Sequence, residues 1–140
     1  MMDVTAARKQ LVDQLFPQGF PRLWCPLIVH YAGEGRIDPV RIRSHLCRIR
    51  PHVRSFLLFG STGDGWELSL AEKTALFAIY AELARELDLH LLIGVLKHRG
   101  ADVESEMTYW LQRLSELSGL ASPTEAMKAC HVVGFTVCPP

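Results

Sequence analysis

The sequence has no surplus of charge of either sign. It contains 15 lysines and arginines against 15 aspartates and glutamates, so its formal net charge is zero. Without a basic surplus the chain has no electrostatic basis for gripping nucleic-acid phosphates. We therefore expect no nucleic-acid partner, and any selectivity for an anion must come from local groups rather than from long-range steering.

Long apolar runs are also missing. No uninterrupted stretch approaches the roughly 20 residues that a membrane-crossing helix needs. The first residues, Met1 to Val4, have neither the basic nor the apolar region of a secretory signal. These absences predict no membrane partner and a cytoplasmic location.

Cysteine is scarce and has no metal-site spacing. The four cysteines form no CxxC pair and fall within apolar stretches: Cys25, Cys47, Cys130 and Cys138. This pattern favours reduced, mostly buried thiols over a disulfide framework. It gives no reason to expect a cofactor or a resident metal.

What is present is an alternation of apolar strands and amphipathic helices. Continuous apolar runs predict strands near 23–29, 55–59, 89–96 and 132–138, and helical periodicity predicts helices near 4–15, 39–50, 70–87, 107–117 and 123–130. Strands that alternate with helices pair in parallel, with right-handed crossovers. This pattern fits either an open doubly wound sheet or a barrel. We expect the helices to cover one side of the sheet, and Phe56, Leu58, Ile93, Val95 and Val133 to line its uncovered inner side.

Helix starts are marked by capping residues. Asp38 precedes Pro39, which suits an N-cap followed by proline at the first helical position. Two further stretches, Ser69 to Glu72 and Ser122 to Glu125, have capping-box spacing.

The most informative segment is a glycine-rich turn after the second predicted strand. Gly60-Ser61-Thr62-Gly63-Asp64-Gly65 offers glycines that allow positive φ, two hydroxyls and successive backbone N–H groups. Such a turn suits a carboxylate, although tight turns of this kind also occur with no ligand. The segment lacks the Gly-Lys-Ser/Thr of a phosphate-binding loop, so nucleotide binding is a weak interpretation.

Here the sequence resembles the dihydrodipicolinate synthase and N-acetylneuraminate lyase family. The likeness lies in Gly60 to Asp64 followed by Glu67 to Lys73, and it is extended by Pro26, by Gly35-Arg36-Ile37-Asp38, by Ile93-Gly94-Val95 and by Val137-Cys138-Pro139-Pro140. The resemblance implies an α/β TIM (β/α)8 barrel, of which this chain would hold only the first four β/α units plus an N-terminal helix. Residues 1–20 would be the N-terminal helix and linker, and residues 21–140 the N-terminal half of the barrel.

The resemblance implies a class I lyase or aldolase that forms a Schiff base with pyruvate or a related 2-oxo acid. Ser61, Thr62 and Gly63 would bind the substrate carboxylate, and Ser61 would also serve the proton relay. The family's tyrosines and its sixth-strand lysine are absent from the 140 residues, so we expect the chain to be inactive by itself. Family members are usually homo-oligomers.

Residues outside the glycine turn allow two other hypotheses, a displaced nucleophile and a zinc site. Lys97 follows the third predicted strand and could act as a displaced nucleophile, whereas Lys9, Lys73 and Lys128 lie on predicted helices and are expected to be solvated. His30, His98, Cys138 and Asp64 could meet at the strand ends as zinc ligands, although scattered histidines are more often hydrogen-bonded loop residues. Trp66, beside the glycine turn, is the tryptophan expected near a substrate.

A second hypothesis, from a different class, is a non-catalytic half barrel. A half barrel has two open strand edges, and open edges invite pairing with another chain. The chain would then be inactive, or would pair with a second copy or with a C-terminal half.

Overall fold

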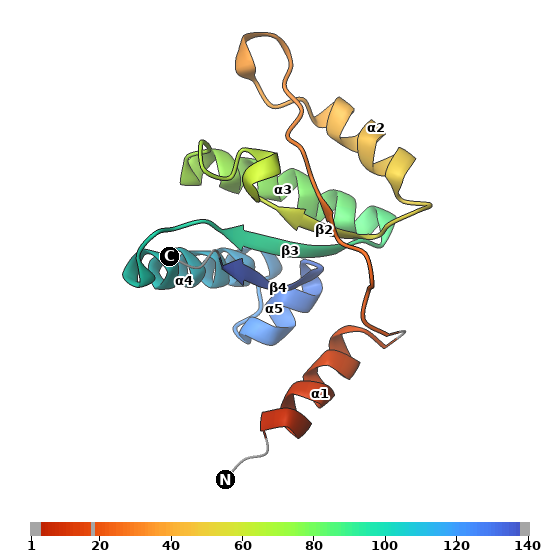
Figure 1. Ribbon diagram of the computed structural model, residues 1–140, viewed down its shortest axis with the longest axis vertical. Coiled ribbons are helices and arrows are strands. Elements are labelled where there is room, and N and C mark those ends of the chain that lie inside the picture. Colours follow the sequence, from red (N-terminus) through yellow and green to blue (C-terminus); the bar gives the residue numbers. More distant parts are fainter. Residues whose placement is uncertain (1–3, 18, 138–140) are drawn as a thin grey trace.

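A computed structural model describes residues 4–17 and 19–137. The elements follow in the order α1 (Val4–Leu15), β1 (Cys25–Pro26), η1 (Gly33–Gly35), α2 (Pro39–Ile49), β2 (Ser55–Leu58), η2 (Ser61–Gly63), α3 (Leu70–Leu87), β3 (His90–Val95), α4 (Gly100–Ser118), α5 (Pro123–Ala129) and β4 (Val132–Val137). Figure 1 shows the strands side by side, with the helices around them. The predicted alternation is confirmed.

The strands form one parallel sheet in the order β1-β2-β3-β4. Each strand therefore pairs with its neighbour along the chain, which is the arrangement of a barrel wall and differs from a doubly wound sheet with its reversal of strand order. A shift in register between Leu91 and Leu92 bends the β3–β4 pair.

The first strand is much shorter than the predicted 23–29. It spans only Cys25–Pro26, and one further bond beyond it joins the Leu27 N–H to the Leu57 carbonyl at 3.0 Å. Pro26 has no N–H to donate, which limits pairing and confines it to a sheet edge.

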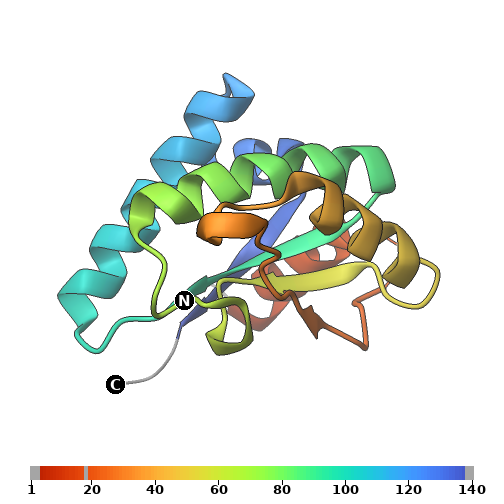
Figure 2. The ribbon, with the colours of Figure 1, turned by 90° about the horizontal axis from the view of Figure 1, so that it is seen from above.

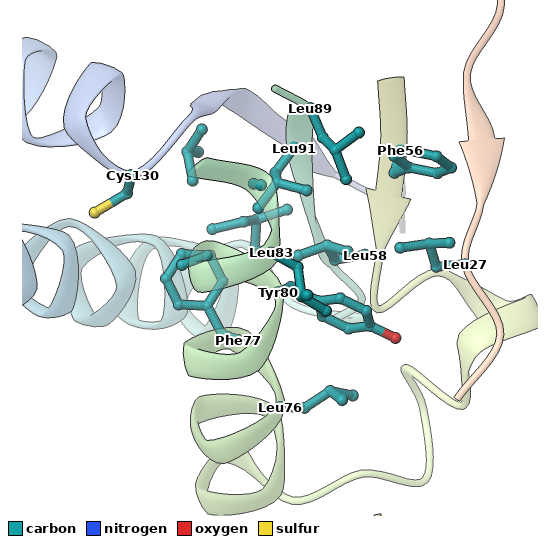
Figure 3. Packing of buried hydrophobic residues seen from close by; sticks show 14 of the residues in the cluster. Leu27, Phe56, Leu58, Leu76, Phe77, Tyr80, Leu83, Leu89, Leu91 and Cys130 are labelled. Atoms are coloured by element: carbon teal, nitrogen blue, oxygen red, sulfur yellow. The ribbon is translucent and has the colours of Figure 1, made fainter. Parts of the chain in front are cut away.

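Helices α2 to α5 cover one side of the sheet, as predicted (Figure 2). The core between them is shown in Figure 3, where Phe56, Leu58 and Leu91 of the strands meet Phe77 and Tyr80 of α3. Trp110 of α4 completes this core and has no exposed surface.

The prediction about the inner side of the sheet is wrong. Phe56, Leu58, Ile93 and Val95 are each 0% exposed because they point towards the helices, and only Val133 is half-buried. Strand side chains alternate between faces, so the opposite side carries the residues in between. We call that side the open face; it is lined by Leu57, Leu92, Gly94, Gly134 and Thr136.

The members of the open face are small or half-buried. Leu57 and Leu92 are partly exposed, and a side chain at Gly134 would meet the Leu92 Cδ1 atom at 3.5 Å, which places both residues on the same face. On an uncovered side of the sheet, Phe56 and Ile93 would lack neighbours to bury them. Because both side chains lie under the helices, each is fully buried. Whether the chain associates stays a prediction, and it now depends on the open face.

The segment after α1 closes the amino-terminal end of the sheet. Phe16 is 6% exposed and its ring meets the ring of His90, the first residue of β3, at 5.4 Å. Phe20 and Trp24 pack against the Phe16 ring. Helix α1 itself is largely exposed, so this aromatic cluster holds the N-terminal segment to the sheet.

The capping predictions divide. Ser69 accepts from the Glu72 N–H at 3.3 Å, and the Glu72 carboxylate accepts from the Ser69 N–H at 2.8 Å, so this capping box is present. Asp38 caps α2 through the Arg41 N–H. Ser122 makes no side-chain cap to α5, and the second capping box is wrong. The spacing alone cannot distinguish them, because the rotamer decides whether the hydroxyl reaches the N–H.

Two residues, Lys73 and Cys47, differ from their predicted exposure to solvent. Lys73 is buried, with a side chain that is 3% exposed, whereas the sequence predicted a solvated lysine. The reason is a partner: Glu106 of α4, itself 4% exposed, lies 3.4 Å from the Lys73 ammonium. Cys47 is exposed rather than buried, while Cys130 lies in the core as expected.

In the described residues, no helix combines the length and apolarity required to cross a bilayer.

Candidate functional site

The glycine turn follows β2 at the carboxyl end of the sheet. Phe59 leaves the strand with a φ of 57°, and η2 then forms a single 3₁₀ turn over Ser61–Gly63. The Gly60 carbonyl accepts from both the Gly63 and Gly65 N–H groups, at 2.9 and 3.0 Å. In parallel (β/α)8 barrels, active sites lie at the carboxyl ends of the strands, which is where this turn lies.

The glycines serve close approach rather than positive φ. Gly60 has a φ of −73°, and the left-handed positions of this segment are Phe59 and Asp64. A Cβ on Gly65 would lie 1.9 Å from the Phe59 carbonyl oxygen, and one on Gly63 would lie 2.3 Å from the Leu27 carbonyl oxygen. Glycine is required here because backbone passes over backbone, which corrects the reason that the sequence suggested.

The turn presents backbone donors to solvent. Ser61 and Thr62 open a 3₁₀ turn, where N–H groups have no partner within the helix. Within residues 4–17 and 19–137, no acceptor pairs with either N–H group. Both side chains are exposed. Two adjacent N–H groups and two exposed hydroxyls therefore lie in the same turn, and groups of this kind suit a carboxylate.

Trp66 lies against the turn, as predicted. Its Nε1 donates to the Ser61 Oγ at 3.2 Å, and its ring stacks on the His98 ring with centroids 4.8 Å apart and planes 17° apart. The Ser61 oxygen thus accepts from the indole, which leaves the Ser61 O–H free to donate. His98, considered above as a zinc ligand, here fixes the indole.

Tyr31 is a residue that the sequence analysis missed. Its hydroxyl donates to the Asp64 Oδ2 at 2.7 Å, which ties the loop after β1 to the glycine turn. Burial, reinforced by the hydrogen bond to Asp64, raises the pKa of Tyr31 to about 12. Tyr31 is therefore protonated at neutral pH. No local motif marks it, since 33 residues separate the partners.

Lys97 lies after β3, but its ammonium group is paired. The Lys97 Nζ is 3.2 Å from the Glu106 Oε2 in the buried carboxylate that also holds Lys73. Trp110 donates its indole N–H to the same carboxylate at 3.4 Å. The Lys97 amine is therefore engaged by the Glu106 carboxylate, and this arrangement does not favour Lys97 as a nucleophile.

Three of the four residues weighed as zinc ligands have other partners, and the fourth is not among the described residues. His30 bonds to His45, His98 stacks on Trp66 and Asp64 accepts from Tyr31, while Cys138 lies outside the described residues. Within the described part of the chain, no group of three or more histidine, cysteine or acidic residues could hold a metal ion.

Comparison with known proteins gives a fold and no sequence family. No family model matches the chain. No curated protein matches it either.

Several solved structures match with probability 1.00, including the following two. A provisionally assigned dihydrodipicolinate synthetase from Pseudomonas aeruginosa aligns with a TM-score of 0.59 and 17% identity, covering 83% of this chain and 34% of its own. The 4-hydroxy-tetrahydrodipicolinate synthase of the thermoacidophilic methanotroph Methylacidiphilum fumariolicum SolV aligns with a TM-score of 0.60 and 16% identity, covering 84% of this chain and 33% of its own. The chain spans about a third of the length of these structures.

At these identities the likeness concerns the fold. The parallel order β1-β2-β3-β4, the helices on one side and the turn after β2 agree with the resemblance seen in the sequence. The described residues therefore have the fold of part of a dihydrodipicolinate synthase barrel.

Proposed function

We propose that this chain supplies the carboxylate-binding half of a Schiff-base lyase or aldolase that acts on pyruvate or a related 2-oxo acid. The observation that carries the proposal is the pair of N–H groups at Ser61 and Thr62, at the carboxyl end of β2, for which the described part of the chain supplies no acceptor. The fold shared with two dihydrodipicolinate synthases supports it.

The turn suits a 2-oxo acid because it fixes the carboxylate without adding a positive charge. Backbone N–H groups donate to the two carboxylate oxygens, and the Thr62 hydroxyl adds a third donor. A charge-assisted hydrogen bond of this kind contributes about 1.5–3 kcal/mol. Fixing the carboxylate orients the neighbouring carbonyl for attack by an amine, which is the positioning that such chemistry needs.

Ser61 is the residue that we assign to proton transfer. Its oxygen accepts from Trp66, so its own proton can be donated towards a hydroxyl leaving a carbinolamine. General acid–base assistance of this type speeds a reaction by about 10²–10⁴-fold. The amine itself comes from outside the four β/α units, since Lys97 and Lys73 are both held by Glu106.

The test is pyruvate binding by the 140-residue chain, followed through the amide NMR signals of Ser61 and Thr62. We expect these signals to shift on addition of pyruvate, and Thr62→Val to weaken binding about tenfold or more. Thr108→Val, an exposed change on α4, is the matched control and should leave binding unchanged. Unmoved turn signals, or equal weakening by both variants, would contradict the carboxylate assignment.

Borohydride reduction in the presence of pyruvate tests the second part of the proposal. We expect no covalent adduct by mass spectrometry, because the two lysines nearest the strand ends are paired. An adduct on Lys97 would move the nucleophile to β3 and overturn this assignment.

A further inference from the structure

Basic residues are concentrated between the loop after β1 and the start of β2. The stretch from residue 36 to residue 54 contains six arginines and two histidines but a single acidic residue, Asp38. The whole chain is neutral. The excess is therefore local, and it lies on and around α2.

Half of these arginines contact the end of α3 and the residue after it. Arg43 forms a two-pronged pair with Glu86, and Arg54 lies 3.0 Å from the Asp88 carboxylate. Arg50 donates through its Nε to the Leu87 carbonyl. All three turn towards the end of α3, where acidic residues or a carbonyl receive them.

The opposite side of α2 pairs with a single acidic residue in the described part of the chain, Asp38. Arg41, Ser44, His45 and Arg48 are spaced three or four residues apart, so they share one face of the helix. With His30 from the loop after β1, these residues line an open hollow of about 310 Å³. Arg41 is partly occupied by Asp38, at 3.4 Å, and donates to the Tyr31 carbonyl at 3.2 Å. Arg48 has no side-chain partner within residues 4–17 and 19–137.

The two histidines of the hollow touch each other. The His30 Nε2 and the His45 Nδ1 are 2.9 Å apart, and their ring centroids are 4.8 Å apart. One of these nitrogens must give a proton and the other must accept it, so the contact requires at least one neutral ring. Burial and the neighbouring His30 lower the pKa of His45. The contact therefore holds the pair short of its full charge, in a hollow whose remaining groups are two guanidinium groups and the Ser44 hydroxyl.

We propose that this hollow, lined by His30, Arg41, Ser44, His45 and Arg48, is a binding site for a phosphate-type oxyanion. A tetrahedral phosphoryl group has three or four oxygens, enough to take the guanidinium fork of Arg48, the Ser44 hydroxyl and an imidazole N–H together. Arginine suits such groups because its planar fork donates two parallel hydrogen bonds. A planar carboxylate has only two oxygens and would leave donors unused. The site is separate from the turn after β2 and does not rest on the function proposed for it.

The experiment follows the imidazole NMR signals of the full 140-residue chain during titration with inorganic phosphate, with chloride added to constant ionic strength. A second titration uses glycerol 3-phosphate, which separates free phosphate from a phosphate monoester. We expect the His30 and His45 signals to shift and saturate. Arg48→Gln should weaken binding by roughly tenfold or more, because it removes a charge-assisted pair of bonds.

Arg8→Gln on α1 is the matched control, with the same change of charge at an exposed helical position. It should leave the phosphate affinity within twofold. The proposal is overturned if neither phosphate nor its monoester moves the two histidines. It is also overturned if chloride alone reproduces the shift, or if Arg8→Gln weakens binding as much as Arg48→Gln does. Because Arg48 is exposed, both variants should melt like the parent chain, which a thermal scan checks.

Discussion

The two sides of the sheet differ in how deeply they bury their side chains. The helix-covered side holds Phe56, Leu58 and Ile93 with no exposed surface, while the open face holds Leu57 and Leu92 half-buried at neighbouring positions of the same strands. The residues are of similar type and differ by one step along the strand. The helix layer covers one set and not the other. Apolar character alone therefore does not show which side chains contribute most to the free energy of unfolding.

The largest effects should come from the covered side. Phe56→Ala leaves a cavity beneath α2 and α3, and we expect it to lower the free energy of unfolding by about 3–5 kcal/mol in urea denaturation. Leu57→Ala, one residue along, is the matched change on the open face and should cost about 1 kcal/mol. Equal losses would mean that the open face is covered in solution, and would favour association of the chain.

The buried ion pair should show the next largest effect. Glu106→Gln leaves the Lys73 ammonium without a counter-charge at 3% exposure, and removal of one partner from such a pair typically costs about 3–5 kcal/mol. Lys97 can turn to solvent and moderates the loss. The exposed Glu104→Gln on the same helix makes the same change of charge and should alter stability by less than about 0.5 kcal/mol. A small loss for both would show that water reaches Lys73.

The pKa of Tyr31 reports on the polar contacts at the carboxyl end of the sheet, where its hydroxyl donates to Asp64. Its pKa of about 12, against an ordinary 10.0, means that the unfolded chain releases this proton at a lower pH than the folded chain does. The stability that Tyr31 contributes is therefore complete below about pH 10 and is lost as the pH rises towards 12.

Asp64→Asn should lower the pKa of Tyr31 without returning it to 10.0, because burial is the larger cause of the shift. Ring-carbon NMR distinguishes Tyr31 from Tyr80 and Tyr109 during the titration. An unchanged pKa in the variant would show that the contact with Asp64 does not form in solution.

The smallest effect concerns two of the helices that build the covered side. Ser69→Ala removes the cap of α3 and should destabilise the chain by about 1 kcal/mol. Ser122→Ala at the start of α5 should change stability little, since its side chain makes no cap. Thermal melts of the two variants decide the point, and similar losses would show that Ser122 does cap α5.

Much of the fold was predictable because it rests on local patterns. The bounds of α1, the cap of α2 by Asp38 and the capping box at Ser69 follow from periodicity and from contacts within four residues. Parallel pairing followed from the alternation of strands and helices. The glycine turn was also found from sequence, because its residues are consecutive.

Tertiary structure alone decided the rest, since each remaining feature joins residues far apart in the chain. Which face of a strand is covered depends on where the helices return, so Phe56 and Ile93 were placed on the wrong side. Lys73 is buried because Glu106 arrives from another helix, and Tyr31 belongs to the turn because β1 lies beside β2. The sequence by itself determined the order of the elements and the position of the glycine turn. Only packing could decide the partners of each charge and each strand face, because those depend on distances that no local pattern encodes.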